Sequence, residues 1–325
     1  MPRVSINLCC YNSARFLDQT LRSLVRQTYT DWELVIVNDG STDGTDQIIH
    51  RYIEEGWPIV YHAQPNTGLA PSRNQALHLS SGEFIAFTDH DDVWEPDKLE
   101  RQLPLFATDA RIGLVYSDCL NVRDDGYIFR QFDKLQPAAG DAFRRLFTNY
   151  FLSLQTVVIH RKALHGGTEW FDERFEVLED TDFFVRVARR WHLAFVDAPL
   201  ARIRMHRHST THAKRDRFPL EMRLVLQKQR EFNPDFDREF AQDIRRLEME
   251  IVRVEARIAW ERHRRAHALA LLAPYRDQDA GVRRDAWLIR CLPYPWYQRL
   301  QRLAVIPSRR SRLDRALATQ QMMSR

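Results

Sequence analysis

Three carboxylates stand within four positions of this chain, at Asp89, Asp91 and Asp92. They directly follow the apolar run 84–87, which predicts a short buried strand that ends at the acidic cluster. Neighbouring carboxylates repel one another unless a cation or a hydrogen-bond donor lies among them. Oxygen ligands suit a hard divalent cation such as Mg²⁺ or Mn²⁺, which also binds a substrate phosphate. A solvated acidic turn is the alternative interpretation of this segment taken alone.

Strands and helices alternate around this cluster. The apolar periodicity predicts strands at 4–8, 32–37, 59–61, 84–88 and 114–118, and helices over 14–27, about 45–56, 71–79 and from 96 onward. Short connections between them predict an α/β fold with a doubly wound, mostly parallel sheet. In such sheets ligands bind beyond the carboxyl ends of the strands, which is where Asn12, Asp39, Asn66 and Asp89 fall. The sequence therefore predicts one site assembled from several strand ends.

The chain lacks the glycine-rich phosphate motifs G-x-G-x-x-G and G-x-x-x-x-G-K-[ST], so a bound nucleotide must be held in another way. A cation bound by Asp91 would bridge a diphosphate, and the carboxylate of Asp39 would accept a hydrogen bond from a base N–H. The segment 39–44 is also typical of a turn followed by a helix cap, and the two interpretations are compatible.

Four blocks, taken in order, resemble the inverting family 2 glycosyltransferases with the GT-A (Rossmann-like) fold. They are residues 4–12, 27–45, 66–77 and 81–100, and the resemblance covers roughly residues 3–210. It implies a nucleotide-sugar site that contains Asn12, Asp39 near the base, Arg73 near base or phosphate, Asp89 near ribose and metal, and Asp91 as the main metal ligand. His90 stands where the family has a small residue, and its role stays open.

The resemblance also assigns the transfer reaction. Inverting transfer needs a base that takes the proton of the acceptor hydroxyl. The family's acidic block is matched by Glu179-Asp180, which makes Asp180 the candidate base, with Glu179 and Trp94 expected near the acceptor or behind the base. His206 is expected to join Asp89 and Asp91 at the metal. The alternatives are a helix N-terminus for 179–182 and a solvated basic loop for 202–212.

Composition sets the class of protein. Of 325 residues, 44% are hydrophobic and 28% charged, and the mean hydropathy is -0.48, which indicates a globular chain with a core. No apolar run is long enough for a transmembrane helix, and the first predicted strand leaves no room for a signal peptide. The four cysteines, Cys9, Cys10, Cys119 and Cys291, form no paired framework, so we expect them reduced in a cytoplasmic protein.

Charge divides the chain unequally, because residues 1–200 carry a net -9 and residues 201–325 a net +13. We expect a catalytic domain at 1–215, with a nucleotide-sugar half over about 1–120 and an acceptor half over about 121–215. A C-terminal helical extension at 216–275 and a basic aromatic tail at 276–325 follow. An apolar seam over 236–258 fits either packing within the chain or a homodimer. Aromatic residues among arginines in the tail suit an anionic membrane surface, and no nucleic-acid motif accompanies them.

These observations predict a metal-dependent inverting glycosyltransferase. It would move a sugar from a nucleoside-diphosphate donor, a UDP-sugar favoured, to an acceptor hydroxyl in cell-surface polysaccharide or lipopolysaccharide assembly. Mn²⁺ or Mg²⁺ is the expected cofactor, and a saccharide or lipid-linked saccharide the expected acceptor. The expected location is cytoplasmic, peripheral at the inner face of the cell membrane. The alternatives are a sugar-nucleotide nucleotidyltransferase, which expects a glycine-rich loop where 9–13 has no glycine, and a non-catalytic membrane-associated adaptor.

Overall fold

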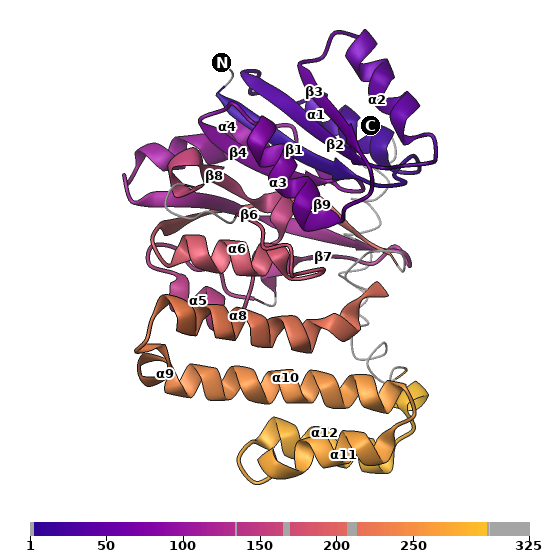
Figure 1. Cartoon of the computed structure of the whole chain (residues 1–325), viewed down its shortest axis with the longest axis vertical. Coiled ribbons are helices and arrows are strands. Elements are labelled where there is room, and N and C mark those ends of the chain that lie inside the picture. The colour runs from indigo at the N-terminus through magenta and orange to yellow at the C-terminus, as the bar shows by residue number, and fades with distance from the viewer. Residues whose placement is uncertain (1–2, 134, 165–169, 207–212, 298, 300–325) are drawn as a thin grey trace, which may run out of the picture. The chain divides into compact units, whose positions relative to one another are not determined.

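The computed structural model describes residues 3–133, 135–164, 170–206, 213–297 and 299 (Figure 1). The chain forms two compact units, residues 1–215 and residues 216–325. Of the segment 202–212, whose alternative interpretation was a solvated basic loop, residues 207–212 lie outside the described residues.

The first unit is built on a mixed sheet with the strand order β3-β2-β1-β4-β8-β6-β9-β5, and β7 pairs with β6 (Figure 1). The strands are β1 (Val4–Cys10), β2 (Trp32–Asp39), β3 (Ile59–Gln64), β4 (Phe84–Asp89), β5 (Val93–Trp94), β6 (Ile112–Arg123), β7 (Ile128–Arg130), β8 (Val158–His160) and β9 (His192–Met205). Strands β1 to β4 pair in parallel, whereas β8 runs antiparallel to both β4 and β6. The predicted α/β fold with a mostly parallel sheet is confirmed.

Helices connect these strands and cover the sheet. They are α1 (Leu17–Val25), α2 (Thr45–Glu54), α3 (Leu69–Leu79), α4 (Lys98–Gln102), α5 (Phe143–Thr148) and α6 (Glu179–Ala188). All residues of β1 and β2 are buried, as expected for central strands covered on both faces. Helix α1 buries Leu17, Leu21 and Leu24 against them in the main apolar cluster, which explains its predicted one-sided pattern.

The strand ends that carry the predicted site meet at one edge of the sheet. Cys10 of β1 is in register with Asn38 of β2, and Cys9 is in register with Asp89 of β4. Gly40 follows β2 with φ at +77°, and a Cβ there would lie 2.7 Å from the backbone N of Asn66. Glycine therefore allows the turns after β2 and β3 to approach one another closely.

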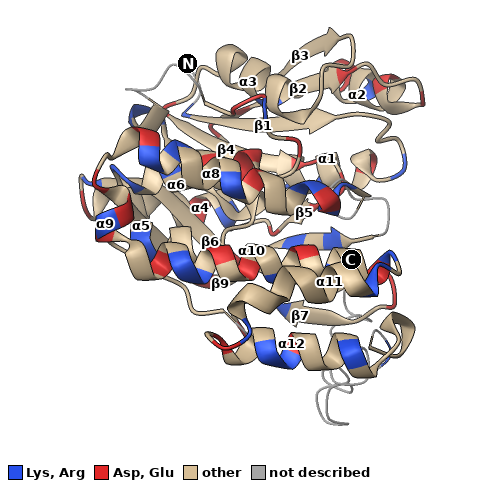
Figure 2. Ribbon diagram, turned by 60° about the horizontal axis from the view of Figure 1, so that its bottom comes forward, with Lys and Arg blue, Asp and Glu red and all other residues tan. Residues whose placement is uncertain are grey.

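The second unit consists of helices α8 (Phe218–Phe232), α9 (Phe236–Glu239), α10 (Ala241–Glu261), α11 (Arg265–Leu272) and α12 (Ala280–Cys291). Acidic and basic residues are interspersed along α10 (Figure 2). Val252, Ala256, Ala259 and Trp260 of α10 pack in one apolar cluster with residues of α11 and α12. The expected boundary at 275 therefore falls within one packed unit, because α12 packs in the same apolar cluster as α10 and α11.

The predicted apolar seam over 236–258 is divided between two helices, since α9 ends at Glu239 and α10 begins at Ala241. Helix α10 packs against α8, α11 and α12 of its own unit. Packing within the chain is thus the alternative that the structure shows for this seam. In the part of the chain that the structure describes, no helix has both the length and the apolar character needed to cross a bilayer.

Candidate functional site

Asp39 is the last residue of β2, and its carboxylate binds the turn that follows β3. Its Oδ1 accepts hydrogen bonds from the side chain of Gln64 and from the backbone N–H of Thr67, both at 2.9 Å. Its Oδ2 accepts from the backbone N–H of Gly68 at 2.9 Å. Burial alone would raise the pKa of Asp39, but these hydrogen bonds outweigh it and hold the pKa below its usual value. Asp39 is therefore an ionised acceptor at the strand-end edge.

Arg73 of α3 joins the two acidic segments of the chain. Its Nη2 lies 3.0 Å from Oδ1 of Asp89, and its Nη1 pairs with Oε1 of Glu179. The second oxygen of Asp89 accepts from Nε2 of Gln155 at 2.7 Å. Burial disfavours the charge of Arg73, but Glu179 and Asp89 outweigh it and raise its pKa. One buried cation thus holds the end of β4 and the start of α6 together.

Asp91 faces the end of β9. Its Oδ2 lies 2.7 Å from Nε2 of His206, and its carbonyl accepts from the guanidinium of Arg204. The buried carboxylate of Asp92 accepts from the backbone N–H of Arg204 at 2.9 Å. The ring of His206 lies 5.5 Å from that of Phe16. These contacts place His206 beside Asp91 of the acidic cluster.

Glu179 and Asp180 begin α6 in different surroundings. Glu179 is buried against Arg73, and burial raises its pKa to about 7. Asp180 is partly exposed, and burial also raises its pKa. Its Oδ1 accepts from the backbone N–H of Thr181 at 2.6 Å and its Oδ2 from the hydroxyl of Tyr150 at 3.2 Å. Both acids have a raised pKa, but only Asp180 is also accessible, as a general base must be.

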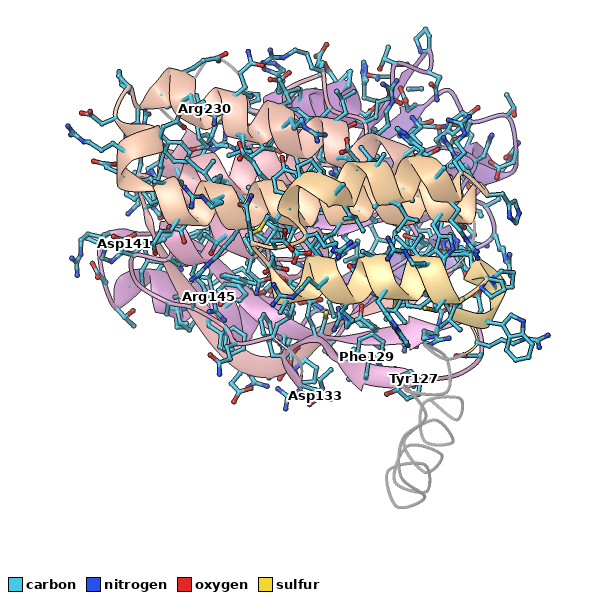
Figure 3. The ribbon with its side chains drawn as sticks, turned by 90° about the horizontal axis from the view of Figure 1, so that it is seen from below. Tyr127, Phe129, Asp133, Asp141, Arg145 and Arg230 are labelled. Carbon is cyan, nitrogen blue, oxygen red and sulfur yellow. The ribbon has the colours of Figure 1, made fainter. Side chains whose placement is uncertain are left out.

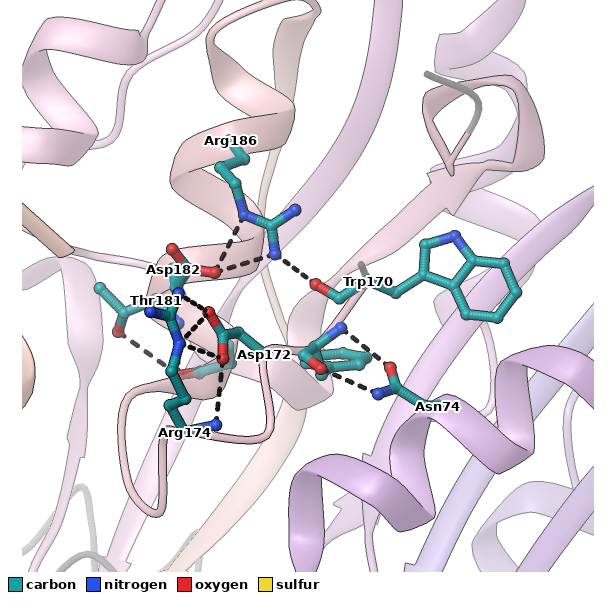
Figure 4. A network of polar contacts seen from close by, with 9 residues as sticks. Asn74, Trp170, Asp172, Arg174, Thr181, Asp182 and Arg186 are labelled. Atoms are coloured by element: carbon teal, nitrogen blue, oxygen red, sulfur yellow. Dashed lines mark hydrogen bonds and ion pairs between the residues drawn. The ribbon is translucent and has the colours of Figure 1, made fainter. Parts of the chain in front are cut away.

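A network of polar contacts fixes the segment that leads into α6 (Figure 4). The side-chain amide of Asn74 donates to the carbonyl of Phe171 at 2.8 Å and accepts from its backbone N–H at 2.9 Å. Arg186 pairs with Asp182 at 2.8 Å and donates to the carbonyl of Trp170. The start of α6 is therefore tied to α3, the helix that also carries Arg73.

Aromatic rings also connect β4, the segment before α6 and α6 itself. The ring of Phe87 in β4 lies 5.9 Å from those of Phe171 and Phe184. Phe171 lies 4.6 Å from Phe183 of α6, and the guanidinium of Arg73 lies 5.6 Å from the ring centre of Phe171. Because protein interiors are close-packed, this aromatic cluster restricts movement of α6 relative to β4.

Trp94 lies in other surroundings than expected, whereas Asn12 lies at the strand ends and makes a structural contact there. Trp94, expected near the acceptor, is 2% exposed and belongs to the main apolar cluster, with Nζ of Lys98 4.3 Å from its ring centre. Pairing of β5 with β9 turns this side chain inward, so Trp94 is not available to an acceptor. Asn12 adopts φ 49° and its Oδ1 accepts from the backbone N–H of Thr42 at 2.8 Å. It therefore links the turn after β1 to the turn after β2.

Two residues of the site were not predicted, Gln155 and Tyr150. Antiparallel pairing of β8 with β4 places Ala86 opposite Val158, which brings Gln155 to the end of β4. Tyr150 follows α5 and reaches Asp180 across 30 positions of sequence. Neither position carries a local pattern in the sequence, and for Gln155 the pairing of β8 with β4 was the missing information.

The predicted metal ligands were Asp89, Asp91 and His206. Asp91 and His206 lie together, whereas both oxygens of Asp89 are bound by Arg73 and Gln155. Within the described residues, no group of three or more His, Cys, Asp or Glu is arranged to hold a metal ion. One carboxylate beside one imidazole suits a Mg²⁺ or Mn²⁺ ion whose other ligands are phosphate oxygens and water. The residues present thus fit a cation that arrives with a diphosphate.

A cavity of about 600 Å³ opens at the other end of the strands. Its lining includes Arg3, which precedes β1, and Phe84, which begins β4. Two of its basic groups lie near one acid, with Arg3 3.5 Å and His160 3.6 Å from Glu83. Because the acidic cluster and Asp180 lie at the carboxyl ends of the strands, we place the functional site there and not in this cavity.

Known proteins match this chain in sequence. The family model "Glycosyl transferase family 2" matches residues 5–164. The putative teichuronic acid biosynthesis glycosyltransferase TuaG of Bacillus subtilis is 42% identical over 104 residues, which is 31% of this chain and 41% of that relative. The chondroitin synthase of Pasteurella multocida is 29% identical over 188 residues, which is 58% of this chain and 19% of that relative. The matched region thus spans less than half the length of either relative.

Solved structures share the fold. The mannosyltransferase PcManGT from Pyrobaculum calidifontis, in complex with GDP-Man and Mn²⁺, has a TM-score of 0.60 at 20% identity and covers 92% of this chain and 84% of its own. Residues 1–349 of S. aureus TarS, in complex with UDP-GlcNAc, have a TM-score of 0.59 at 19% identity, with coverage of 91% and 92%. These likenesses show the GT-A fold that the sequence predicted. Residues 5–164 of this chain belong to glycosyl transferase family 2.

Proposed function

We propose that the protein is a glycosyltransferase that moves a sugar from a nucleoside-diphosphate donor to an acceptor hydroxyl, with inversion at the anomeric carbon. The observation that carries this proposal is the position of Arg73, which pairs with both Asp89 and Glu179. Through it the strand-end residues and the Asp180 carboxylate belong to one site. Family membership supports sugar transfer as the chemistry of that site.

The donor would lie along the strand ends. Asp39 is an ionised acceptor suited to a base N–H, and Asn12 holds the neighbouring turn. A UDP-sugar is the favoured donor. A Mn²⁺ or Mg²⁺ ion bound by Asp91 and His206 would neutralise the departing diphosphate. Arg73 would hold Asp89 in place beside it.

The proposed reaction has one base. The acceptor oxygen attacks the anomeric carbon, the bond from that carbon to the diphosphate oxygen breaks, and the hydroxyl proton moves to Asp180. The hydrogen bonds from Thr181 and Tyr150 orient the carboxylate for this transfer. Its raised pKa makes it a stronger base than an exposed aspartate.

The acceptor is proposed to be a saccharide or lipid-linked saccharide of a cell-surface polymer, as the name of the teichuronic acid relative suggests. The segment 126–150 is a candidate wall for it. On this segment Tyr127 stacks on Phe129 with ring centres 5.6 Å apart, at the edge of the sheet formed by β7 (Figure 3). Stacked aromatic rings suit the apolar face of a sugar.

Asp91→Asn is expected to weaken metal-dependent binding of the donor nucleotide by at least about 10- to 100-fold, because one of two side chains that suit the cation is lost. Calorimetric titration with UDP, GDP, dTDP and CMP, each with Mn²⁺ and with EDTA, measures this. The wild-type chain should bind one diphosphate with Mn²⁺ and lose it with EDTA. Failure of every nucleotide to bind the wild type would contradict the proposed function.

Asp97→Asn is the matched control for this variant. Asp97 is a neighbouring aspartate that forms an exposed ion pair with Arg101 at 3.4 Å. The Asp97→Asn variant should bind the nucleotide as the wild type does. If Asp97→Asn lost as much binding as Asp91→Asn, the effect would belong to the charge of the segment and not to a ligand.

Tyr150→Phe is expected to move the acidic limb of the kcat–pH profile upward by about one pH unit. Arg73 lowers the pKa of Asp180 and Asp89 raises it, and both remain in the variant. The Tyr150 hydroxyl stabilises the ionised carboxylate, so its loss raises this pKa further. Because the base must be ionised, activity then requires a higher pH. An unshifted limb, equal to that of a Tyr29→Phe control, would show that Tyr150 does not act through Asp180.

A further inference from the structure

Helix α12 has one buried face and one exposed face. The buried face, Val282, Asp285, Ala286 and Ile289, packs toward the interior of the second unit. The exposed face carries Arg283, Arg284, Trp287 and Arg290. Trp287 is 60% exposed. Most of this indole faces solvent, with arginines about one turn before and after it along the helix.

The short helical segment 294–297, which follows α12, has the same composition. Tyr294 and Tyr297 pack on Trp260 of α10, with ring centres 5.2 and 5.0 Å apart, which anchors this segment. Trp296 stands between them in sequence and is 58% exposed. The guanidinium of Arg299 lies 5.6 Å from its ring centre. A second accessible indole is thus held beside a second group of positive charge.

Acidic residues do not neutralise this surface. Asp279 accepts from the backbone N–H of Val282 at 2.8 Å and so caps the start of α12. Asp285 is buried and lies 2.8 Å from Arg253 and 3.7 Å from Arg257 of α10, and its contact with Arg284 is a longer one of 3.5 Å. The basic residues of α12 therefore retain an excess of positive charge on its outer side (Figure 2).

We propose that the exposed residues of α12 and of the segment after it, Arg283, Arg284, Trp287, Arg290, Trp296 and Arg299, bind the anionic phospholipid headgroups of a membrane. Indole rings favour the boundary between headgroups and acyl chains, and arginines pair with lipid phosphates. The arginines alone would suit any polyanion, but two exposed indoles among them fit a lipid boundary better than a nucleic-acid backbone. The sequence beyond Arg299 continues the same charge, with Arg302, Arg309, Arg310, Arg312 and Arg315 against Asp314. This inference goes beyond sugar transfer and does not depend on it.

Co-sedimentation of the full chain with vesicles tests the proposal. The chain should sediment with vesicles of phosphatidylcholine mixed with phosphatidylglycerol, less so as salt is raised, and not with phosphatidylcholine alone. The double variant Trp287→Ala/Trp296→Ala should lower the partition coefficient by about tenfold. Arg283→Glu/Arg290→Glu should lower it by about 25-fold or more, from about fivefold for each arginine.

Matched variants keep the test specific. Leu220→Ala removes an apolar side chain of α8 that is 58% exposed, and Arg245→Glu/Arg246→Glu reverses two exposed charges of α10. Both should sediment as the wild type does, and unchanged thermal unfolding of all variants checks their folding. The proposal is overturned if the wild type does not sediment with anionic vesicles, or if the control variants lose as much binding. It is also overturned if the tryptophan variant binds as the wild type, or if duplex DNA is bound more tightly than the vesicles through the same residues.

Discussion

Asp180→Asn is expected to lower kcat by about 10²- to 10⁴-fold while leaving donor affinity unchanged. The amide has nearly the same shape as the carboxylate, so the start of α6 should stay folded. It cannot take the proton of the acceptor hydroxyl, which leaves the attacking oxygen without a base. The measurement is kcat for sugar transfer together with the calorimetric affinity for the nucleotide.

Two further variants show whether the loss belongs to Asp180 alone. Glu173→Gln changes an exposed acid a few residues before α6 and should transfer sugar as the wild type does. Glu179→Gln changes the adjacent acid, which is bound to Arg73 and buried, and should retain more transfer activity than Asp180→Asn. Full activity of Asp180→Asn would show that another group is the base, and loss confined to Glu179→Gln would name it.

Arg73→Met is expected to lower the free energy of unfolding by about 3–5 kcal/mol, because it leaves a buried carboxylate without its partner. The side chains of Arg73 and Glu179 are 8% and 3% exposed, and no hydrogen-bond partner for Oε2 of Glu179 exists among the described residues. The Arg73–Glu179 pair is buried, unlike a surface pair, so water cannot solvate the carboxylate once the arginine is lost. Urea denaturation of the variant and the wild type measures the difference.

The pH dependence of this loss follows from Glu179. Burial raises the pKa of Glu179 to about 7 in the folded chain, above its ordinary value, so its ionisation destabilises the fold as the pH rises through that range. Without Arg73 the folded pKa rises further. The destabilisation by Arg73→Met should therefore be larger at about pH 8 than at about pH 5, where Glu179 is mostly protonated in the folded variant.

A double variant and an exposed pair give the comparison. Arg73→Met/Glu179→Gln removes the stranded charge and should recover most of the lost stability and of its pH dependence. Arg3→Met breaks a pair with Glu83 whose side chains are 52% and 50% exposed, and should cost less than about 1 kcal/mol. Equal losses for Arg73→Met and Arg3→Met would mean that the buried bridge contributes no more than a surface pair.

The predicted site depended on two kinds of sequence information. Apolar periodicity predicted β1, β2 and β4. The rule that parallel strands end at one edge of a sheet predicted that Asn12, Asp39 and Asp89 lie at the same edge. The family resemblance predicted Asp180 as the base, and the helix N-terminus that was the alternative interpretation of 179–182 is present, since α6 begins at Glu179. Both kinds of information are local, since each concerns a strand, a turn or a block read along the chain.

The sequence by itself thus determined the fold class, the edge of the sheet that bears the site, and the acids that are candidates for its chemistry. Only the tertiary structure decided which partners these acids have. Arg73 reaches Glu179 across 106 positions, Gln155 reaches Asp89 across 66, and Trp94 turns into the core. These contacts depend on the antiparallel insertion of β8 beside β4 and on the pairing of β5 with β9. Such long-range pairings leave no period in the sequence, because each strand records only which of its faces is buried and not which strand lies beside it.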